Sequence, residues 1–154
     1  MTQHKNLLLN NQLCFALYAA TNSIIRYYRI YLNEIGITYT QYLVLLVLWE
    51  SESCSIKDIA KTLKLDSPTI TPIVQKLEKL GLVRRVRSTA DERVVLVSLT
   101  KAGIDLEGQV ADIQNKVSCK THLKTKDFNE LKDTLNQLSD TMVKKEKKLD
   151  SLLK

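Results

Sequence analysis

Glycine and proline are both scarce in this sequence, which has four glycines and two prolines among 154 residues. So few turn-forming residues favour a mainly helical protein with few tight turns. No run of 18 apolar residues occurs, so a membrane-spanning helix is excluded. Hydrophobic residues make up 44% of the chain and charged residues 26%, which is normal for a globular protein. The length suits a single domain covering residues 1–154.

Histidine and cysteine are also few, with two and three copies respectively. The cysteines form no CxxC motif, so we expect no metal site and no cofactor. The first ten residues, MTQHKNLLLN, lack the apolar core and the cleavage site of a secretion signal. We therefore expect a cytoplasmic protein, in which cysteines rarely form structural disulfides.

Positive charge is concentrated in the middle and at the end of the chain, although the net charge is only +6. Residues 1–54 carry three basic and three acidic residues, whereas residues 55–93 carry nine basic and five acidic ones. Residues 120–154 again carry an excess of basic residues. A basic segment beside a neutral one suggests a polyanion partner such as nucleic acid.

The spacing of apolar residues predicts six helices and one β-hairpin. Two runs with a period of two residues, VRRVRS and RVVLVSL, are joined by the polar turn TADE and predict the hairpin. The fold class is therefore mainly α with a small β-hairpin. The helices are expected over 5–33, from Thr38 or Thr40 to about Glu50, from Ser53 or Ser55 to about Leu63, from the cap at Asp66 to Leu80, over 100–117, and from about Lys126 to the end.

The segment LDSPTITPIVQKLEKLGL carries clear signals for both ends of the fourth helix. Asp66 and Ser67 are helix-capping residues, Pro68 falls at the first helical position, and Gly81 ends the helix. The inward face is apolar and comprises Ile70, Ile73, Val74, Leu77 and Leu80. The outward face carries hydrogen-bonding and cationic residues, namely Ser67, Thr69, Thr71, Gln75, Lys76 and Lys79.

Two short helices followed by a basic hairpin predict a winged helix-turn-helix over residues 55–100. Its second helix fits the DNA major groove, and an arginine at the hairpin tip fits the adjacent minor groove. Asp91 is placed to hold Arg93 by a charged hydrogen bond. The alternative is a helical protein whose charged β-ribbon contacts nothing. The residues predicted to bind double-stranded DNA are Ser67, Thr69, Thr71, Gln75, Lys76, Arg84, Arg87, Asp91 and Arg93.

A single module of this kind contacts few bases, so such proteins usually bind as pairs on half-sites about 34 Å apart. The segments 1–35 and 101–154 hold more apolar surface than one small domain can bury alone. We expect these segments to form long dimerisation helices in a homodimer.

The stretch LDSPTITPIVQKLEKLGLVRRVRSTADERVVLVSLTKAG closely resembles the MarR family of bacterial transcriptional regulators, above all in its wing-to-helix signature DERxVxVSLTxxG. NQLCFALYAA and ITYTQYLVLLVLWE further resemble the organic-hydroperoxide-sensing repressors of that family, the OhrR type. The resemblance covers roughly residues 8–110 and implies a winged-helix repressor that is not an enzyme. Pro68 stands where that group usually has glycine, and Thr40 where it often has proline.

The resemblance makes Cys14, in the NQLCF motif, a peroxide-sensing thiol. Tyr28 and Tyr39 match two tyrosines that hydrogen-bond this thiol from the partner subunit, and Tyr18 is taken as a third residue of the sensor pocket. Cys14 and Tyr28 are 14 residues apart, so within one straight helix they stand about 21 Å apart and cannot touch. For each tyrosine, simple packing in the core or interface is the alternative.

Two-cysteine members of this group carry a second cysteine near the end of the fifth helix of the other subunit, where Cys119 falls. The resemblance therefore implies an intersubunit Cys14–Cys119 disulfide after oxidation by an organic hydroperoxide. Capping of Cys14 by a small cellular thiol is the alternative. Cys54, at the end of the buried second helix, is expected to be a packing residue.

The resulting hypothesis is a homodimeric repressor that binds palindromic operator DNA while Cys14 is reduced and releases the DNA on oxidation. The first rival is a MarR-type regulator that is released by a small aromatic ligand, with Cys14 inert. The second rival is a thiol peroxidase, for which the sequence lacks the usual TxxC context.

Overall fold

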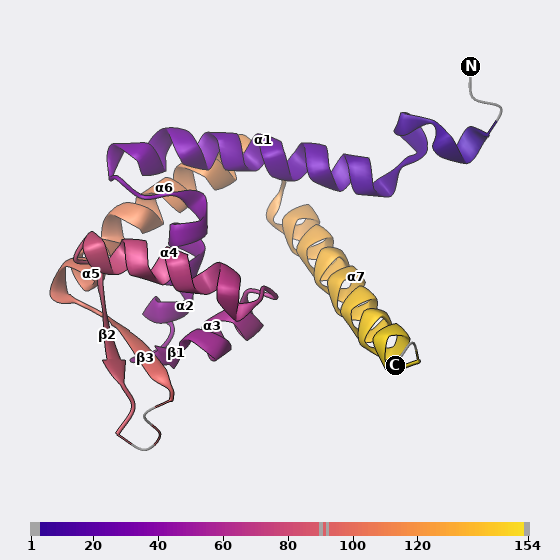
Figure 1. Cartoon of the computed structure of the whole chain (residues 1–154). Helices are drawn as coiled ribbons and strands as arrows, with labels where there is room; N and C mark the ends of the chain where they lie inside the picture. The colour runs from indigo at the N-terminus through magenta and orange to yellow at the C-terminus, as the bar shows by residue number, and fades with distance from the viewer. Residues whose placement is uncertain (1–3, 90, 92, 153–154) are drawn as a thin grey trace. The chain divides into compact units, whose positions relative to one another are not determined.

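The computed structural model describes residues 4–89, 91 and 93–152 (Figure 1). The chain is divided into two compact units, Met1–Val117 and Ser118–Lys154. The elements in chain order are the 3-10 turns η1 (Lys5–Leu7) and η2 (Leu9–Asn11), then α1 (Leu13–Glu34), α2 (Tyr39–Trp49), β1 (Cys54–Ser55), α3 (Ile56–Thr62), α4 (Ser67–Lys79), β2 (Val83–Arg87), β3 (Val95–Leu99), α5 (Lys101–Asp105), α6 (Glu107–Lys120) and α7 (Thr125–Leu152).

Helix α1 begins at Leu13, so the predicted start at residue 5 is wrong. Residues 5–11 form the two 3-10 turns instead. The Asn11 side chain donates to the Lys5 carbonyl at 2.7 Å, and the Gln12 side chain donates to the Asn6 carbonyl. Asparagine side chains compete with helical hydrogen bonds in this way, which explains why the apolar spacing alone misplaced the helix start.

The β-hairpin is present, and it belongs to a three-stranded antiparallel sheet of order β1-β3-β2. Arg85 of β2 and Cys54 of β1 both pair with Val97, which is fully buried in the middle of β3. The strand β1 was not predicted, and Cys54 lies in it rather than at the end of the second helix. Two residues are too few for an alternating pattern to be recognised in the sequence.

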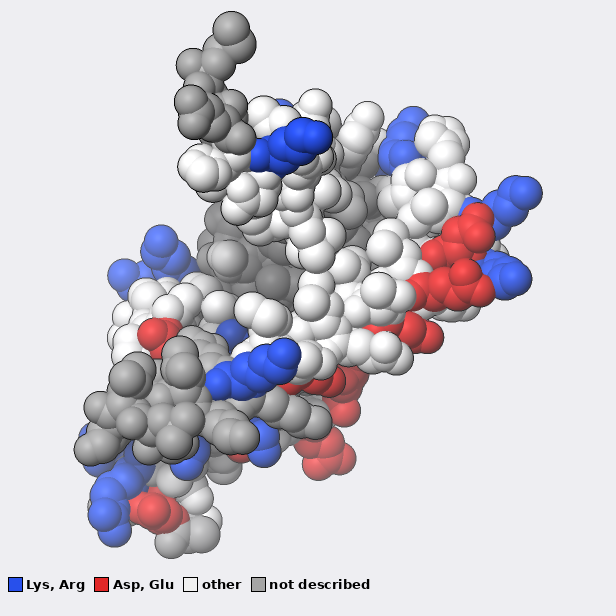
Figure 2. Space-filling view, turned by 90° about the vertical axis from the view of Figure 1, so that its right-hand side faces the viewer, with Lys and Arg blue, Asp and Glu red and all other residues white. Residues whose placement is uncertain are grey.

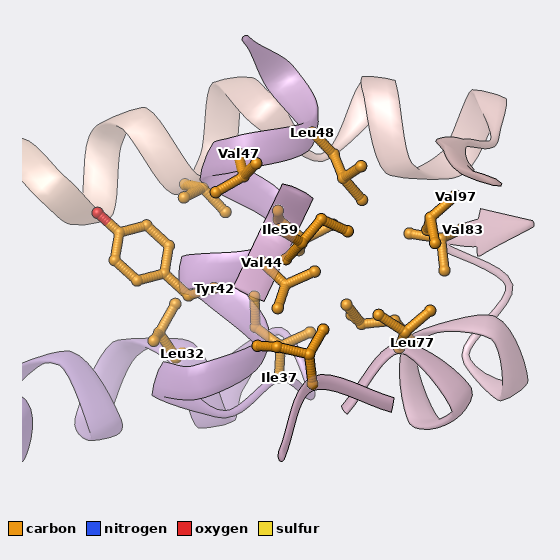
Figure 3. Close-up of a cluster of buried hydrophobic side chains, with 14 of the residues drawn as sticks. Leu32, Ile37, Tyr42, Val44, Val47, Leu48, Ile59, Leu77, Val83 and Val97 are labelled. Atoms are coloured by element: carbon orange, nitrogen blue, oxygen red, sulfur yellow. The ribbon is translucent and has the colours of Figure 1, made fainter. Parts of the chain in front are cut away.

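Helix α2 lies in the core of the first unit (Figure 3). Thr38 caps it, because the Thr38 hydroxyl accepts from the Gln41 amide while the Gln41 side chain accepts from the Thr38 amide at 2.7 Å. Of the two predicted caps, Thr38 is therefore the one used. Val44 and Leu45 have no exposed surface, which confirms that this helix, apolar all round, is buried.

Helices α3 and α4 form the helix-turn-helix, and each begins with a side-chain cap. Ser55 accepts from the Asp58 amide at 3.1 Å, and Asp66 accepts from the Thr69 amide at 2.9 Å. Asp66 is thus the N-cap of α4, and Pro68 occupies the second helical position rather than the first. Both prolines of the chain are accommodated within the helix.

The inward face of α4 is buried where the sequence predicts it. Ile70, Val74 and Leu77 have no exposed surface and pack in the core. Leu80, which was predicted to face inward, is half exposed instead. Leu80 is the C-cap residue of α4, and its amide still donates to the Lys76 carbonyl at 3.1 Å.

A close contact joins the ends of α2 and α4 to the start of α5. Gly103 of α5 lies so near the Leu82 carbonyl that an added Cβ would collide with it. The Trp49 indole donates to the Gly103 carbonyl at 3.0 Å, and the Thr100 hydroxyl donates to the Gly81 carbonyl at 2.6 Å. These bonds connect the helix-turn-helix to the segment that leads into α6.

The segment predicted as one helix over residues 100–117 is divided into α5 and α6 at Leu106. Both hydrogen bonds of Leu106 nevertheless follow the helical pattern, from its amide to the Ala102 carbonyl at 3.1 Å and from the Val110 amide to its carbonyl at 3.2 Å. Helix α6 then buries Val110, Ile113 and Val117 in the core of the first unit.

The second unit contains the long helix α7, which begins within one residue of its predicted start. Over the part of α7 whose side chains are described, residues 125–143 and 145, several large apolar side chains remain exposed. They include Phe128, Leu131, Leu135 and Met142. Among the residues that the structure describes, no helix is long and apolar enough to cross a membrane.

Candidate nucleic-acid interface and thiol sensor

The outward face of α4 is open to solvent along its length. Thr69, Gln75 and Lys76 are exposed, while Ser67 and Thr71 are half-buried. The Thr71 hydroxyl donates to the Ser67 carbonyl at 2.9 Å, so its oxygen stays available as an acceptor. The face therefore presents hydroxyl, amide and ammonium groups, the side chains that contact phosphates and base edges.

The arginines of the wing, which is the hairpin β2–β3, differ in their partners. The Arg84 guanidinium donates to the Ser98 hydroxyl on the neighbouring strand at 2.9 Å. Arg85 is turned toward α4, where it forms an ion pair with Glu78 at 2.6 Å. Arg87, at the end of β2, is exposed. In the view of Figure 2, Lys and Arg side chains project at the lower left, and Asp and Glu side chains gather on the right, where further Lys and Arg side chains project beyond them.

Arg93, just before β3, has 93% of its side chain exposed. The expected pairing with Asp91 is present, since Arg93 Nε lies 3.5 Å from an Asp91 carboxylate oxygen. The same oxygen accepts the Arg93 backbone amide at 3.0 Å. Asp91 thus contacts both the backbone amide and the guanidinium Nε of Arg93, while most of the arginine side chain stays exposed.

A groove of 300 Å³ brings the start of α4 and the wing together. Ser67 from α4 and Arg93 from the wing both line it, with Lys57 from α3 on the same groove. Lys57 was not among the predicted contacts. Its place at the start of a helix, next to a capping serine, is the sequence signal that points to it.

Three tyrosines form a buried cluster where α1 meets α2. The Tyr28 ring lies 5.1 Å from the Tyr42 ring and 5.3 Å from the Tyr39 ring, measured between centroids. The Tyr28 and Tyr42 hydroxyls are 3.5 Å apart. Figure 3 shows the Tyr42 hydroxyl pointing away from the aliphatic side chains of the core. Burial raises the pKa of Tyr39 and of Tyr42, and Tyr28 adds to both shifts.

The cluster differs from the predicted sensor pocket in one member. Tyr28 and Tyr39 are brought together as expected, but Tyr18 is 67% exposed and lies outside the cluster. Tyr42 takes the third place and was missed. Its spacing of three residues from Tyr39 on a predicted helix is the signal that could have identified it.

The three cysteines are free thiols in different surroundings. Cys14 is exposed in the first turn of α1, with its sulfur 3.9 Å from the side-chain oxygen of Gln12. Cys119 is exposed near the end of α6. Cys54 is half-buried in β1 and packs against the core, in agreement with its expected packing role.

A separate pocket of 350 Å³ opens between α2 and α6. Tyr42, Leu46, Trp49 and Val110 supply apolar walls, and Glu107 is one of its polar residues. Its volume falls within the range of small-molecule sites.

The sequence also matches known proteins over most of its length. Residues 26–110 match the family of SarA/Rot transcriptional regulators. An organic hydroperoxide resistance transcriptional regulator of Bacillus subtilis is 41% identical over 137 residues, which are 89% of this chain and 93% of the relative. The chain belongs to this family of MarR- and SarA-type regulators. The resemblance drawn from the sequence motifs is thereby confirmed.

Solved structures of AbfR and of MarR share the fold. Reduced AbfR of Staphylococcus epidermidis, bound to DNA, has 32% identity and a TM-score of 0.73, and the match covers 88% of this chain and 94% of AbfR. Disulfide-formed AbfR has 35% identity and a TM-score of 0.63, covering 87% and 89%. Escherichia coli MarR with operator DNA, at 22% identity and a TM-score of 0.71 over 82% and 92%, shows the fold alone. The winged helix-turn-helix fold class is confirmed.

The residues that match the SarA/Rot family contain some of the candidate site and not the rest. Helix α4, the wing and the tyrosine cluster all fall within 26–110. Cys14 and Cys119 fall outside this range. The family match therefore bears on the DNA-reading elements, and the redox roles of the two thiols need their own test.

Proposed function

We propose that this regulator is a homodimeric repressor that binds palindromic operator DNA while Cys14 is reduced and releases it when an organic hydroperoxide oxidises Cys14. One observation carries the proposal: the two thiols with a suggested redox role are exposed, and the third is packed against the core. An exposed thiol is open to an oxidant, whereas a packed one is protected.

The oxidation proceeds in two balanced steps. The Cys14 thiolate attacks one peroxide oxygen, the S–O bond forms as the O–O bond breaks, and the alkoxide takes up a proton to leave as an alcohol. The thiolate of Cys119 of the partner subunit then attacks the sulfenic sulfur of Cys14. The S–S bond forms, and hydroxide leaves and is protonated to water.

The tyrosine cluster supplies donors for the reactive thiolate. Tyrosine hydroxyls are protonated at neutral pH, and burial raises the pKa of Tyr39 and of Tyr42 further above their ordinary value. A protonated phenol can donate a hydrogen bond to a thiolate and stabilise it. In the proposed dimer, Tyr28 and Tyr39 of one protomer face Cys14 of the other.

The DNA-reading lobe, residues 55–100, contacts DNA through the outward face of α4 and through Arg93. The flanking segments, 1–35 and 101–154, pair the two protomers, and their exposed apolar side chains support this role. A disulfide between the flanking segments changes the separation of the two α4 helices. Since half-site spacing is fixed by the DNA, a shift of a few ångströms breaks contacts on one half-site.

A gel-shift titration with DNA from upstream of the chain's own gene tests the proposal. We expect binding by the reduced protein, release on addition of cumene hydroperoxide, and a dimer-sized band in non-reducing electrophoresis. Cys14→Ser should bind DNA and ignore the hydroperoxide. Cys119→Ser should lose the dimer-sized band, and Cys54→Ser serves as the matched control that keeps both responses. Hydroperoxide-induced release by Cys14→Ser contradicts thiol sensing.

A second candidate function rests on the pocket between α2 and α6. Its aromatic and aliphatic walls suit a small aromatic ligand, which would release the DNA without any thiol chemistry. In that case Cys14→Ser keeps a normal response to the inducer. Ligand-dependent quenching of Trp49, the single tryptophan and a wall of this pocket, detects such binding directly.

A further inference from the structure

The Glu78 carboxylate of α4 contacts three nitrogen atoms of Arg85 in β2, across the turn that joins the two elements. One oxygen of the Glu78 carboxylate accepts from Arg85 Nε at 2.7 Å and lies 2.6 Å from Arg85 Nη2. The other oxygen accepts the Arg85 backbone amide at 3.2 Å. One side chain of α4 therefore holds both the backbone and the guanidinium of a wing residue.

The two residues stand at positions where they control the direction of the wing. Glu78 is in the last turn of α4, and only residues 80–82, with Gly81 at a φ of +72°, lead from that helix to β2. Arg85 is the middle residue of β2 and pairs with the buried Val97 of β3. The contact thus spans the turn on which the wing would pivot against α4.

Beyond this contact, a small rotation of the wing produces a larger displacement at its tip. From the level of Arg85 to Arg93 at the tip is about four residues of strand, or about 13 Å. A rotation of about 10° at the corner therefore moves the tip by about 2 Å. Functional groups need placement to within about 0.5 Å, so an unsupported corner would misplace Arg93 in the minor groove.

Neither helix stability nor charge explains an acid at this position. A negative side chain in the last turn of a helix is disfavoured by the helix dipole. A carboxylate between α4 and a wing rich in arginine also lowers the positive potential that attracts DNA. Both side chains remain about one-third exposed, and exposed ion pairs stabilise folds little.

We propose that Glu78 and Arg85 are a positioning pair, which fixes the wing relative to α4 so that Arg93 and the outward face of α4 bind DNA together. The proposal rests on the DNA-binding part of the proposed function. It separates Arg85 from the three arginines of the wing that were predicted to contact DNA. Arg85 acts through the geometry of the wing, and Glu78 contributes although its charge repels phosphate.

Glu78→Gln tests this role, because charge alone and positioning predict opposite changes in DNA affinity. By charge alone, Glu78→Gln strengthens DNA binding, because one negative charge is lost near the DNA. We expect instead that it weakens binding by about fivefold or more, measured by fluorescence anisotropy on the upstream duplex that the unaltered protein shifts. The matched control is Asp105→Asn, which removes the carboxylate of the exposed Lys101–Asp105 ion pair at 3.3 Å and should not weaken binding. Equal or tighter binding by Glu78→Gln overturns the proposal.

A double-mutant cycle with Arg93 separates positioning from general stability. We expect Arg93→Ala to weaken binding by about tenfold in the unaltered protein and by less than about twofold in the Glu78→Gln background. Additive effects overturn the positioning role, whereas no effect of Arg93→Ala in the unaltered protein refutes the proposed DNA interface and this proposal with it. Measurement near 150 mM salt limits direct charge coupling between the two sites.

Arg85→Lys provides a second, charge-conserving variant. It keeps the net charge but cannot reproduce the forked contact with Glu78. We expect Arg93→Ala to weaken binding by less than about twofold in the Arg85→Lys background as well. The circular dichroism spectrum of Arg85→Lys should be unchanged, so this test stands even where Glu78→Gln folds poorly. If Arg93→Ala weakens binding by about tenfold in the Arg85→Lys background, as in the unaltered protein, the proposal is overturned.

Discussion

The DNA-reading lobe has fully buried apolar side chains at its centre, whereas the flanking helices α1 and α7 carry large apolar side chains that are exposed. In the lobe, Ile59, Ile70 and Leu77 have no exposed surface. In α1 and α7, side chains of similar size are more than half exposed, such as Ile30 at 59% and Met142 at 62%. The lobe therefore completes its core within one chain. Helices α1 and α7 leave many apolar side chains uncovered, although α1 also places Tyr28 and Leu32 in the core.

This difference assigns different sources of stability to the two regions. Burial of apolar surface within one chain stabilises the lobe whatever the protein concentration. Exposed apolar stripes on long helices gain the same energy only when a second copy covers them, so their contribution depends on concentration. Substitutions in the lobe should therefore change the free energy of unfolding at any protein concentration. Substitutions in the flanking helices should instead change the dissociation constant of the dimer.

The largest effect is expected for Leu77→Ala in the lobe. Leu77 is fully buried between α4 and the core, so its truncation leaves a cavity and should lower the free energy of unfolding by about 2–5 kcal/mol. Urea unfolding followed by circular dichroism measures the change. The loss should be the same at low and high protein concentration, and a strong dependence on concentration contradicts a core that one chain completes.

The paired substitution Leu131→Ala with Leu135→Ala in α7 should act on association instead. Both side chains are more than one-third exposed in the single chain, so the dimer should weaken by about 1–3 kcal/mol for each residue. Analytical ultracentrifugation measures the dissociation constant, with Asp133→Ala on the same helix as the control. An unchanged dissociation constant would show that α7 is not part of the interface.

Much of the lobe could be predicted because its signals are local. A capping aspartate and a proline in the first turn mark the start of α4, and a glycine just after the last turn marks its end. The strand β1 escaped because only its pairing with the distant Val97 defines it. The start of α1 was misplaced because Asn11 bonds to Lys5 across a turn, a contact that apolar spacing does not encode.

The residues of the candidate site also differ in whether local sequence signals reveal them. The Asp91–Arg93 pair lies within one turn and was found from the sequence. Glu78 and Arg85 face each other across a corner, and the sequence alone treats both as ordinary surface charges. The three-residue spacing of Tyr42 from Tyr39 could have pointed to Tyr42, but its contact with Tyr28 arises from packing between two helices, which the sequence does not show.

A smaller effect is expected at the cap of α2, which lies between α1 and the lobe in the sequence. Thr38→Ala removes the hydroxyl that accepts from the Gln41 amide and should lower the free energy of unfolding by about 1 kcal/mol. Thr40→Ala is the matched control, because Thr40 follows the cap and was the rejected alternative. Equal losses for the two variants in thermal unfolding would contradict the assignment of Thr38 as the cap.

Alkaline pH should act on the tyrosine cluster and leave the lobe intact at first. The pKa of Tyr39 and of Tyr42 is raised above the ordinary 10.0 in the folded protein. The neutral phenols therefore contribute stability that is complete below pH 10 and is lost as the pH rises above it. Tyr42→Phe should move the loss of α1–α2 packing to higher pH, measured by near-ultraviolet circular dichroism. An unchanged alkaline transition would contradict burial of the Tyr42 hydroxyl.

Acid pH should act on the lobe, with the smallest effect of the series because the groups are exposed. Bonds to Thr69 lower the pKa of Asp66 below 3.8, and Arg85 lowers the pKa of Glu78 below 4.5. Each carboxylate thus contributes stability that is present above its unfolded pKa and is lost as the pH falls below about 4. Asp66→Asn keeps a capping side chain but cannot titrate, so it should flatten this part of the stability curve. Thermal unfolding between pH 3 and 6 measures the slope, and an equal slope in Asp66→Asn would exclude the cap as its source.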